Sequence, residues 1–120
     1  MALSAGASSQ TPLSGEQVYK ETCSDCHATG KDKAPRFGDR NAWAPLIKEG
    51  QPALSADAWL GVRAMPPRGG RPSLSLEEFS RAVAYMARSS GGNWKDPDAV
   101  MLERIKVQEK KLLARRKAKP

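Results

Sequence analysis

The chain has 120 residues, which is enough for one domain with a small hydrophobic core. Its formal net charge of +7 is uneven: residues 14–92 carry 11 Lys and Arg against 9 Asp and Glu, a net of +2, whereas residues 93–120 carry 9 against 4, a net of +5. The length leaves no room for a second large domain, and no stretch of the sequence approaches a transmembrane helix in length.

Residues 1–13 are rich in Ser, Ala and Gly, and we expect a flexible leader there. The segment has neither the basic start nor the long apolar run of a signal peptide. Ala5-Gly6-Ala7 resembles the small-residue end of a cleavage site. We therefore expect either a trimmed mature form or a domain excised from a larger protein.

The first predicted helix begins after Ser14, which can form a capping box with Gln17. The helix runs from there into residues 23–27. Gly15 and Tyr19 lie four positions apart, so they place bare backbone and an aromatic ring on one face. Such a face suits a close crossing with another helix.

The segment Cys23-Ser24-Asp25-Cys26-His27 has the C-x-x-C-H pattern by which a c-type haem is attached to protein. Each thiol can add to one vinyl group of the porphyrin, and His27 follows as the proximal iron ligand. Both cysteines and the only histidine of the chain fall within these five residues. The pattern therefore predicts one covalently bound haem c.

Other interpretations of Cys23 and Cys26 are weaker. A structural zinc ion takes four ligands, usually as two spaced pairs, and the sequence has no second pair. A thioredoxin-like redox pair accompanies a parallel sheet, and no run here resembles a buried parallel strand. A chance coincidence of two ordinary thiols with a histidine stays open at this point.

The run from Ala28 to Pro35 lacks apolar periodicity and contains turn formers, so we expect a loop there. A ligating imidazole usually donates its second ring nitrogen to an oxygen acceptor, which fixes its orientation. The Pro35 carbonyl is the candidate acceptor for His27, because the proline ring stiffens the local backbone.

Two short helices are predicted next. The first spans about 41–48; Pro45 suits a first turn, so we favour Asn41 over Asp39 as the cap. The second spans about 52–60, beginning at a proline and ending before a glycine.

The segment Ala64-Met65-Pro66-Pro67-Arg68-Gly69-Gly70 places proline and glycine around one methionine, which excludes a helix on either side. A thioether is a soft ligand for iron, and a stiff, extended loop can bring it to the face opposite His27. Met65 is therefore the predicted sixth ligand. The alternatives are a Met65 that only fills a gap, or a terminal, core or tail methionine as ligand: Met1, Met86 or Met101.

The last core helix is predicted to begin at a capping box of Ser75 with Glu78, supported by a hydrophobic staple between Leu74 and Phe79. Apolar side chains then recur at helical spacing until a Ser/Gly run ends the helix near residue 90. The first helix is its expected partner.

Residues 93–120 are predicted to be a separate basic helical extension that begins at Asp96-Pro97. Acidic residues lie early and basic residues late, which suits the helix dipole. Gln108 and Glu109 interrupt its apolar stripe. The helix is therefore either solvated or bound to a partner.

Taken together, these motifs resemble the short bacterial class I cytochromes c, especially those of the cytochrome c5 kind. The resemblance covers about residues 14–90, and its motifs are Gly15 with Tyr19, the C-x-x-C-H segment, Ala34-Pro35-Arg36-Phe37-Gly38-Asp39, Trp43-Ala44-Pro45 and Ala64-Met65-Pro66-Pro67-Arg68-Gly69-Gly70. This chain lacks the extra cysteine pair of some relatives, and the resemblance says nothing about the extension.

The resemblance implies an all-α, class I cytochrome c fold of about four short helices around one haem c, followed by the helical extension. The expected organisation is a leader at 1–13, a cytochrome c domain at 14–92 and the extension at 93–120. His27 and Met65 would ligate the iron, the Pro35 carbonyl would hold His27, and Trp43 would line the pocket.

An iron held by His27 and Met65 has no open position for a substrate, so we expect an electron carrier and not an enzyme. Haem attachment follows export in bacteria, which indicates the periplasm. The expected respiratory partners are a quinol-oxidising complex or dehydrogenase as donor and a terminal oxidase or reductase as acceptor.

Two alternatives stay open. One is a dedicated electron-transfer subunit of a larger oxidoreductase complex, docked through the basic tail. The other is a haem enzyme or gas sensor, which requires Met65 to be off the iron. The tail also suits an anionic membrane surface or an acidic partner, whereas nucleic acid is a poor partner for an exported protein.

Overall fold

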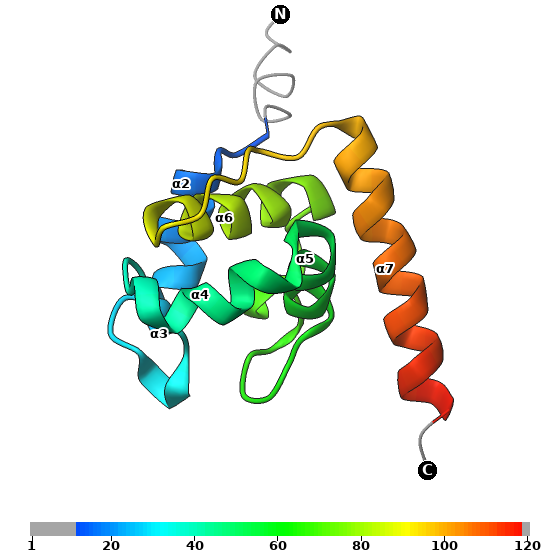
Figure 1. Ribbon diagram of the computed structural model, residues 1–120, viewed down its shortest axis with the longest axis horizontal. Coiled ribbons are helices and arrows are strands. Elements are labelled where there is room, and N and C mark those ends of the chain that lie inside the picture. The colour runs from blue at the N-terminus through cyan, green and yellow to red at the C-terminus, as the bar shows by residue number, and fades with distance from the viewer. Residues whose placement is uncertain (1–11, 119–120) are drawn as a thin grey trace, which may run out of the picture.

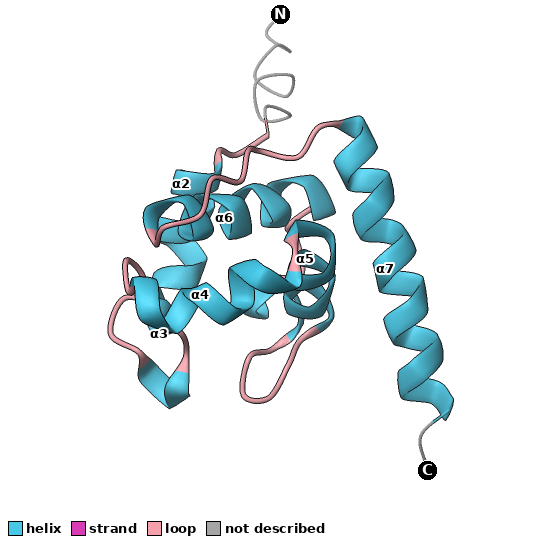
Figure 2. Cartoon of the chain, viewed as in Figure 1, coloured by secondary structure: helices cyan, strands magenta, loops and turns pink. Residues whose placement is uncertain are grey.

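The computed structural model describes residues 12–118, which are helical and contain no named strand. Short helices form a body, and one long helix runs along its side (Figures 1 and 2). This arrangement confirms the predicted all-α class. The predicted leader lies outside the described residues except for residues 12 and 13.

The N-terminal helical segment has three parts in direct succession: α2 (Gly15–Val18), the π-helix η1 (Tyr19–Cys23) and α3 (Ser24–His27). The predicted capping box is present, because Ser14 Oγ accepts from the Gln17 amide at 3.1 Å and Gln17 Oε1 accepts from the Ser14 amide at 2.8 Å. The segment thus carries the C-x-x-C-H residues on one helical stretch, as predicted.

The loop after α3 contains one short 3-10 turn, η2 (Lys31–Lys33), and leads to α4 (Arg40–Glu49). The cap of α4 is Asp39, whose Oδ1 accepts from the Ala42 amide at 3.0 Å. The preference for Asn41 was therefore wrong. The carboxylate cap starts the helix earlier, and Pro45 lies inside it, where its ring nitrogen has no hydrogen to donate.

Helix α5 (Gln51–Leu60) agrees with the prediction and ends at Gly61, whose φ is 93°. In the following turn, the Met65 amide donates to the Val62 carbonyl at 2.8 Å and the Val62 amide donates to the Met65 carbonyl at 3.1 Å. The short 3-10 turn η3 (Pro67–Gly70) comes next. Residues 61–72, the Met65 loop, therefore contain no α-helix.

Helix α6 (Leu76–Ser89) has the predicted capping box, with reciprocal hydrogen bonds between Ser75 and Glu78 of 3.0 and 3.1 Å. It crosses α2 closely, as predicted. A Cβ atom added to Gly15 would lie 2.3 Å from the Arg81 carbonyl oxygen and 3.1 Å from Tyr85 Cβ. Only a residue without a side chain permits this approach.

Helix α7 (Ala99–Ala118) begins later than predicted. Its cap is Asp98, whose Oδ1 accepts from the Met101 amide at 2.8 Å, so the predicted start at Asp96-Pro97 was wrong. Asp96 pairs instead with Arg88 of α6 at 3.0 Å. No described helix is long and apolar enough to cross a membrane.

The extension packs against the body through α5. Ile105 of α7 is 0% exposed, Trp94 belongs to the main hydrophobic cluster, and Gln51 Nε2 donates to the Lys95 carbonyl at 2.8 Å. The inner face of α7 is thus neither solvated nor free for a partner. The division of the chain into a cytochrome c domain and a separate unit at 93–120 stays a prediction.

Candidate functional site

His27 ends α3 and is buried, with 7% of its surface exposed. Its Nδ1 lies 2.8 Å from the Pro35 carbonyl oxygen, the contact that the sequence predicts. Because a carbonyl only accepts hydrogen bonds, Nδ1 must carry the hydrogen. In a neutral imidazole the lone pair then lies on Nε2, which is the atom available to a metal.

The two cysteines are free thiols one helical turn apart, Cys23 buried and Cys26 half-buried. Burial raises the pKa of the Cys23 thiol to about 12, and the nearby Asp25 carboxylate adds to the rise. A thiol that stays protonated at neutral pH is a poor redox nucleophile and a poor zinc ligand. This environment disfavours the thioredoxin-like alternative.

The π-helix η1, which ends at Cys23, had no sequence signal. Its wider turn closes where the Ser24 amide donates to the Tyr19 carbonyl, and Ser24 Oγ also donates to the Lys20 carbonyl at 3.0 Å. Such turns are rare in proteins overall, and those that occur often lie at functional sites. The π turn thus lies at the first of the two thiols.

Trp43 of α4 is 2% exposed and lies beside His27. The two ring centroids are 6.2 Å apart with planes tilted by 45°, and Trp43 Nε1 donates to the Arg36 carbonyl at 3.1 Å. The loop between α3 and α4 is thus held by the indole as well as by the imidazole. Trp43 is placed next to the predicted proximal ligand, and its contact with haem stays a prediction.

Met65 is half-buried and packs against the same hydrophobic cluster that contains Cys23 and Trp43. Its loop is tied to the N-terminal segment by Arg71, whose Nη1 lies 2.9 Å from Glu21 Oε1 and 3.3 Å from Thr22 Oγ1. The fold therefore connects the methionine loop to the helix that carries the thiols. Ligation of iron by Met65 stays a prediction.

Sequence reasoning missed the role of Trp59, which lies between the Met65 loop and α7. The Arg68 guanidinium lies 4.4 Å from the centre of its ring, and Trp59 Nε1 donates to Glu109 Oε2 at 3.0 Å. Glu109 lies fifty positions from Trp59 in the chain, and Arg68 belongs to a loop whose backbone is left-handed at that residue, with φ of 54°. No local sequence pattern predicts this contact of Arg68 and Glu109 with the same indole.

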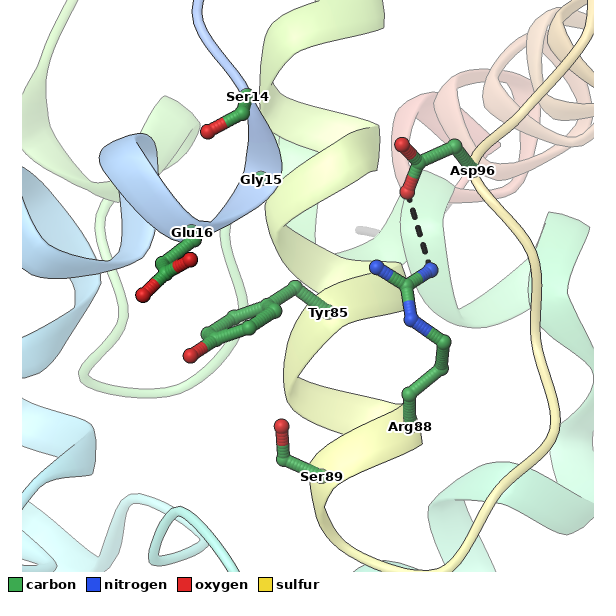
Figure 3. Close-up of a pocket in the computed structure, with 7 residues that line it drawn as sticks. All are labelled: Ser14, Gly15, Glu16, Tyr85, Arg88, Ser89 and Asp96. Carbon is green, nitrogen blue, oxygen red and sulfur yellow. Dashed lines mark hydrogen bonds and ion pairs between the residues drawn. The ribbon is translucent and has the colours of Figure 1, made fainter.

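An open depression lies at the crossing of α2 and α6 (Figure 3). It is separate from the residues that are predicted to hold the haem. Its lining includes Gly15, Tyr85 and the ion pair of Arg88 with Asp96. It contains no thiol, imidazole or thioether. We therefore do not assign it to the cofactor.

The donor set fits a haem and not a structural metal ion. Within residues 12–118, no three His, Cys, Asp or Glu side chains come together to hold a metal ion. The chain instead offers two unbridged thiols on one turn, an imidazole with its Nδ1 fixed, and a thioether on a loop. These groups suit a porphyrin that brings four iron ligands of its own.

A C-x-x-C-H helix in an all-α fold of this size defines a c-type cytochrome. The sequence model of the family described as cytochrome c oxidase, cbb3-type, subunit III matches residues 10–86. Cytochrome c-555 of Chlorobaculum thiosulfatiphilum is 39% identical over 63% of this chain and 93% of its own length. Cytochrome c5 of Azotobacter vinelandii is 37% identical over 62% of this chain and 92% of its own length.

A solved structure agrees with these relatives. It is a cytochrome c chain in the crystal structure of an electron transfer complex of nitrite reductase with cytochrome c. The sequences are 42% identical, the TM-score is 0.63, and the match covers 68% of this chain and 99% of that chain.

The chain therefore belongs to this family of small cytochromes c, which confirms the resemblance and the fold. Its relatives are electron carriers and not enzymes, and the family carries one covalently bound haem c, so the predicted class and cofactor are confirmed as well. The family match ends at residue 86 and leaves α7 outside it.

Proposed function

We propose that this cytochrome transfers single electrons through a low-spin haem iron ligated by His27 and Met65. The observation that carries the proposal is the 2.8 Å contact of His27 Nδ1 with the Pro35 carbonyl, because it leaves Nε2 as the coordinating atom. The place of Met65 on a loop that packs against the same cluster as Cys23 supports a second ligand.

The residues around the iron would fix its ligands. The bound haem supplies a one-electron ferrous–ferric couple whose potential is raised by methionine ligation. The Pro35 carbonyl orients His27, and the buried indole of Trp43 beside it excludes water. If His27 and Met65 both held the iron, no ligand position would be left for a substrate, so the site would favour electron transfer over catalysis.

Carbon monoxide distinguishes this carrier from a haem enzyme or gas sensor. The reduced wild-type protein should keep its spectrum under carbon monoxide, whereas Met65→Ala should bind the gas at the vacated position. Met86→Leu, which changes the buried methionine of α6, is the control and should match the wild type. Rapid binding of the gas by the wild type would mean that the iron is open.

We further propose a periplasmic location and respiratory redox proteins as partners. Haem attachment after export supports the location. The similar cytochrome c in the complex with nitrite reductase supports a terminal reductase as one class of acceptor. A quinol-oxidising complex or a dehydrogenase is the corresponding donor, and a terminal oxidase is the other acceptor class.

A second candidate function is favoured by the family description, which names an oxidase subunit. In that case the cytochrome is a dedicated electron-transfer subunit of a larger oxidoreductase complex, and the outer face of α7 is its docking element. Exposed Val107 lies there between two basic rows, by helical spacing: Lys106, Lys110 and Lys117 on one side, and Arg104, Lys111 and Arg115 on the other. An acidic protein surface or an anionic membrane is the complementary partner.

Charge removal on that face tests the docking element without disturbing the packed face of α7. The triple variant Lys106→Gln, Lys110→Gln, Lys117→Gln should no longer co-purify with a membrane oxidoreductase. The rate at which that complex reduces the variant should fall and should depend less on the salt concentration. Lys20→Gln, Lys31→Gln, Lys33→Gln removes the same charge from the body as a control. Binding of the wild type, but not of the α7 variant, to vesicles of anionic lipid alone would favour the membrane. Equal behaviour of both variants in every assay would reject the docking element.

A further inference from the structure

We propose that α7 clamps the Met65 loop from outside, and that Arg116 and Glu109 are positioning residues that keep Met65 on the iron. The inference rests on the proposed function, because it takes Met65 as the sixth ligand. It gives the extension a role within the chain, independent of any partner.

The first hold is at the base of the loop. Arg116 Nη2 donates to the Gly61 carbonyl at 3.0 Å and lies 3.9 Å from Asp57 Oδ1. Gly61 is where α5 ends and the loop begins. Arg116 therefore fixes the last turn of α5 and the first peptide of the loop together.

The returning limb of the loop lies directly on that glycine. A Cβ atom added to Gly61 would be 2.9 Å from the Pro67 nitrogen and 3.1 Å from the Met65 carbonyl oxygen. The Met65 backbone thus rests on the residue that Arg116 holds. A shift of Gly61 would move the backbone of the ligand with it.

The second hold acts through Trp59. Glu109 Oε2 accepts from the indole Nε1 at 3.0 Å, which orients the ring, and the Arg68 guanidinium of the loop lies 4.4 Å from its centre. A cation above an aromatic face is attracted by the ring electrons. By orienting the indole, Glu109 therefore also positions Arg68 on the far side of the loop.

The loop needs such holds, because its backbone is strained. Arg63 and Arg68 are non-glycine residues with φ of 52° and 54°, a region that L-residues adopt at a cost. Arg71 anchors the end of the loop to Glu21 and Thr22. The clamp from α7 supplies the anchor at the other end, and the fully buried Ile105 fixes α7 itself.

Displacement of methionine by imidazole measures the clamp. The full-length ferric protein with its haem is mixed with excess imidazole, and the far-red absorption band of iron bound to methionine sulfur is followed in time. Arg116→Gln and Glu109→Ala should each lose the band roughly fivefold faster than the wild type, the effect expected for one net hydrogen bond. Arg116→Lys keeps the charge and one donor and should restore most of the delay.

Lys48→Gln is the control, since it removes one positive charge from an exposed position in the last turn of α4. Its rate should equal that of the wild type. If Arg116→Gln and Glu109→Ala also lose the band at the wild-type rate, the clamp is rejected while ligation by Met65 stands. The same holds if these variants lower the melting temperature without changing that rate. If the wild type has no far-red band, it is the ligation in the proposed function that fails.

Discussion

At His27, a single backbone carbonyl determines what the imidazole can do. The Pro35 oxygen takes the Nδ1 hydrogen, so the ring can bind a metal only through Nε2. The Phe37 amide donates to the His27 carbonyl at 2.7 Å and closes the loop around this pair. The His27 imidazole is therefore held in the orientation that leaves Nε2 for the metal.

Glu78 links stability to pH. Its carboxylate accepts from the Leu13 and Ser75 amides, each at 3.0 Å, and these hydrogen bonds hold its pKa below the ordinary value of 4.5. Because the folded pKa lies below the unfolded one, the stabilisation is present above about pH 4.5 and is lost as the pH falls through the folded pKa.

We expect Glu78→Gln to lower the free energy of unfolding by about 1 kcal/mol at pH 7, since one amide oxygen cannot replace both carboxylate contacts. Urea unfolding at pH 7 and at pH 3 measures this. The difference between the variant and the wild type should shrink at pH 3. A difference that is the same at both pH values would show that the carboxylate charge is not involved.

At the scale of elements, the crossing of α2 and α6 depends on Gly15. Gly15→Ala should gain helix propensity of about 1 kcal/mol, but its Cβ would lie 2.3 Å from a backbone carbonyl that cannot move aside. We expect a net loss of about 1–3 kcal/mol. The measurement is thermal unfolding, with Glu16→Ala on the exposed neighbouring position as the control. The haem spectrum of Gly15→Ala should be unaffected. Unchanged stability of this variant would refute the crossing.

The packing of α7 on α5 is tested by two aliphatic residues of the same helix. Ile105 is 0% exposed and Val107 is 50% exposed. Ile105→Ala should cost about 2–4 kcal/mol of unfolding free energy, and Val107→Ala less than about 0.5 kcal/mol. Denaturant unfolding of the protein with its haem compares the two. Equal costs would mean that α7 is solvated on all sides in solution.

At the scale of the whole molecule, the sequence predicts the features that short-range chemistry controls. The capping boxes at Ser14 and Ser75, the end of α5 at Gly61 and the thiols of residues 23–27 all depend on neighbours within four positions. The close helix crossing at Gly15 was also predicted, because Gly15 and Tyr19 share one helix face four positions apart.

The features that the sequence did not predict depend on tertiary contacts. Glu109 interrupts the apolar stripe of α7 and thus indicates solvent, yet it accepts from Trp59 fifty positions away. The π-helix η1 has no residue pattern of its own. The choice of Asp39 over Asn41 as the α4 cap was decided by a carboxylate accepting from the Ala42 amide, and the local pattern allowed both.

The central claim, an iron closed by His27 and Met65, is tested most directly by the far-red absorption band of the ferric protein. The wild type should show the weak band of iron bound to methionine sulfur, and Met65→Ala should lose it while its haem stays covalently attached through Cys23 and Cys26. A band that persists in Met65→Ala, or that is absent from the wild type, would contradict the claim.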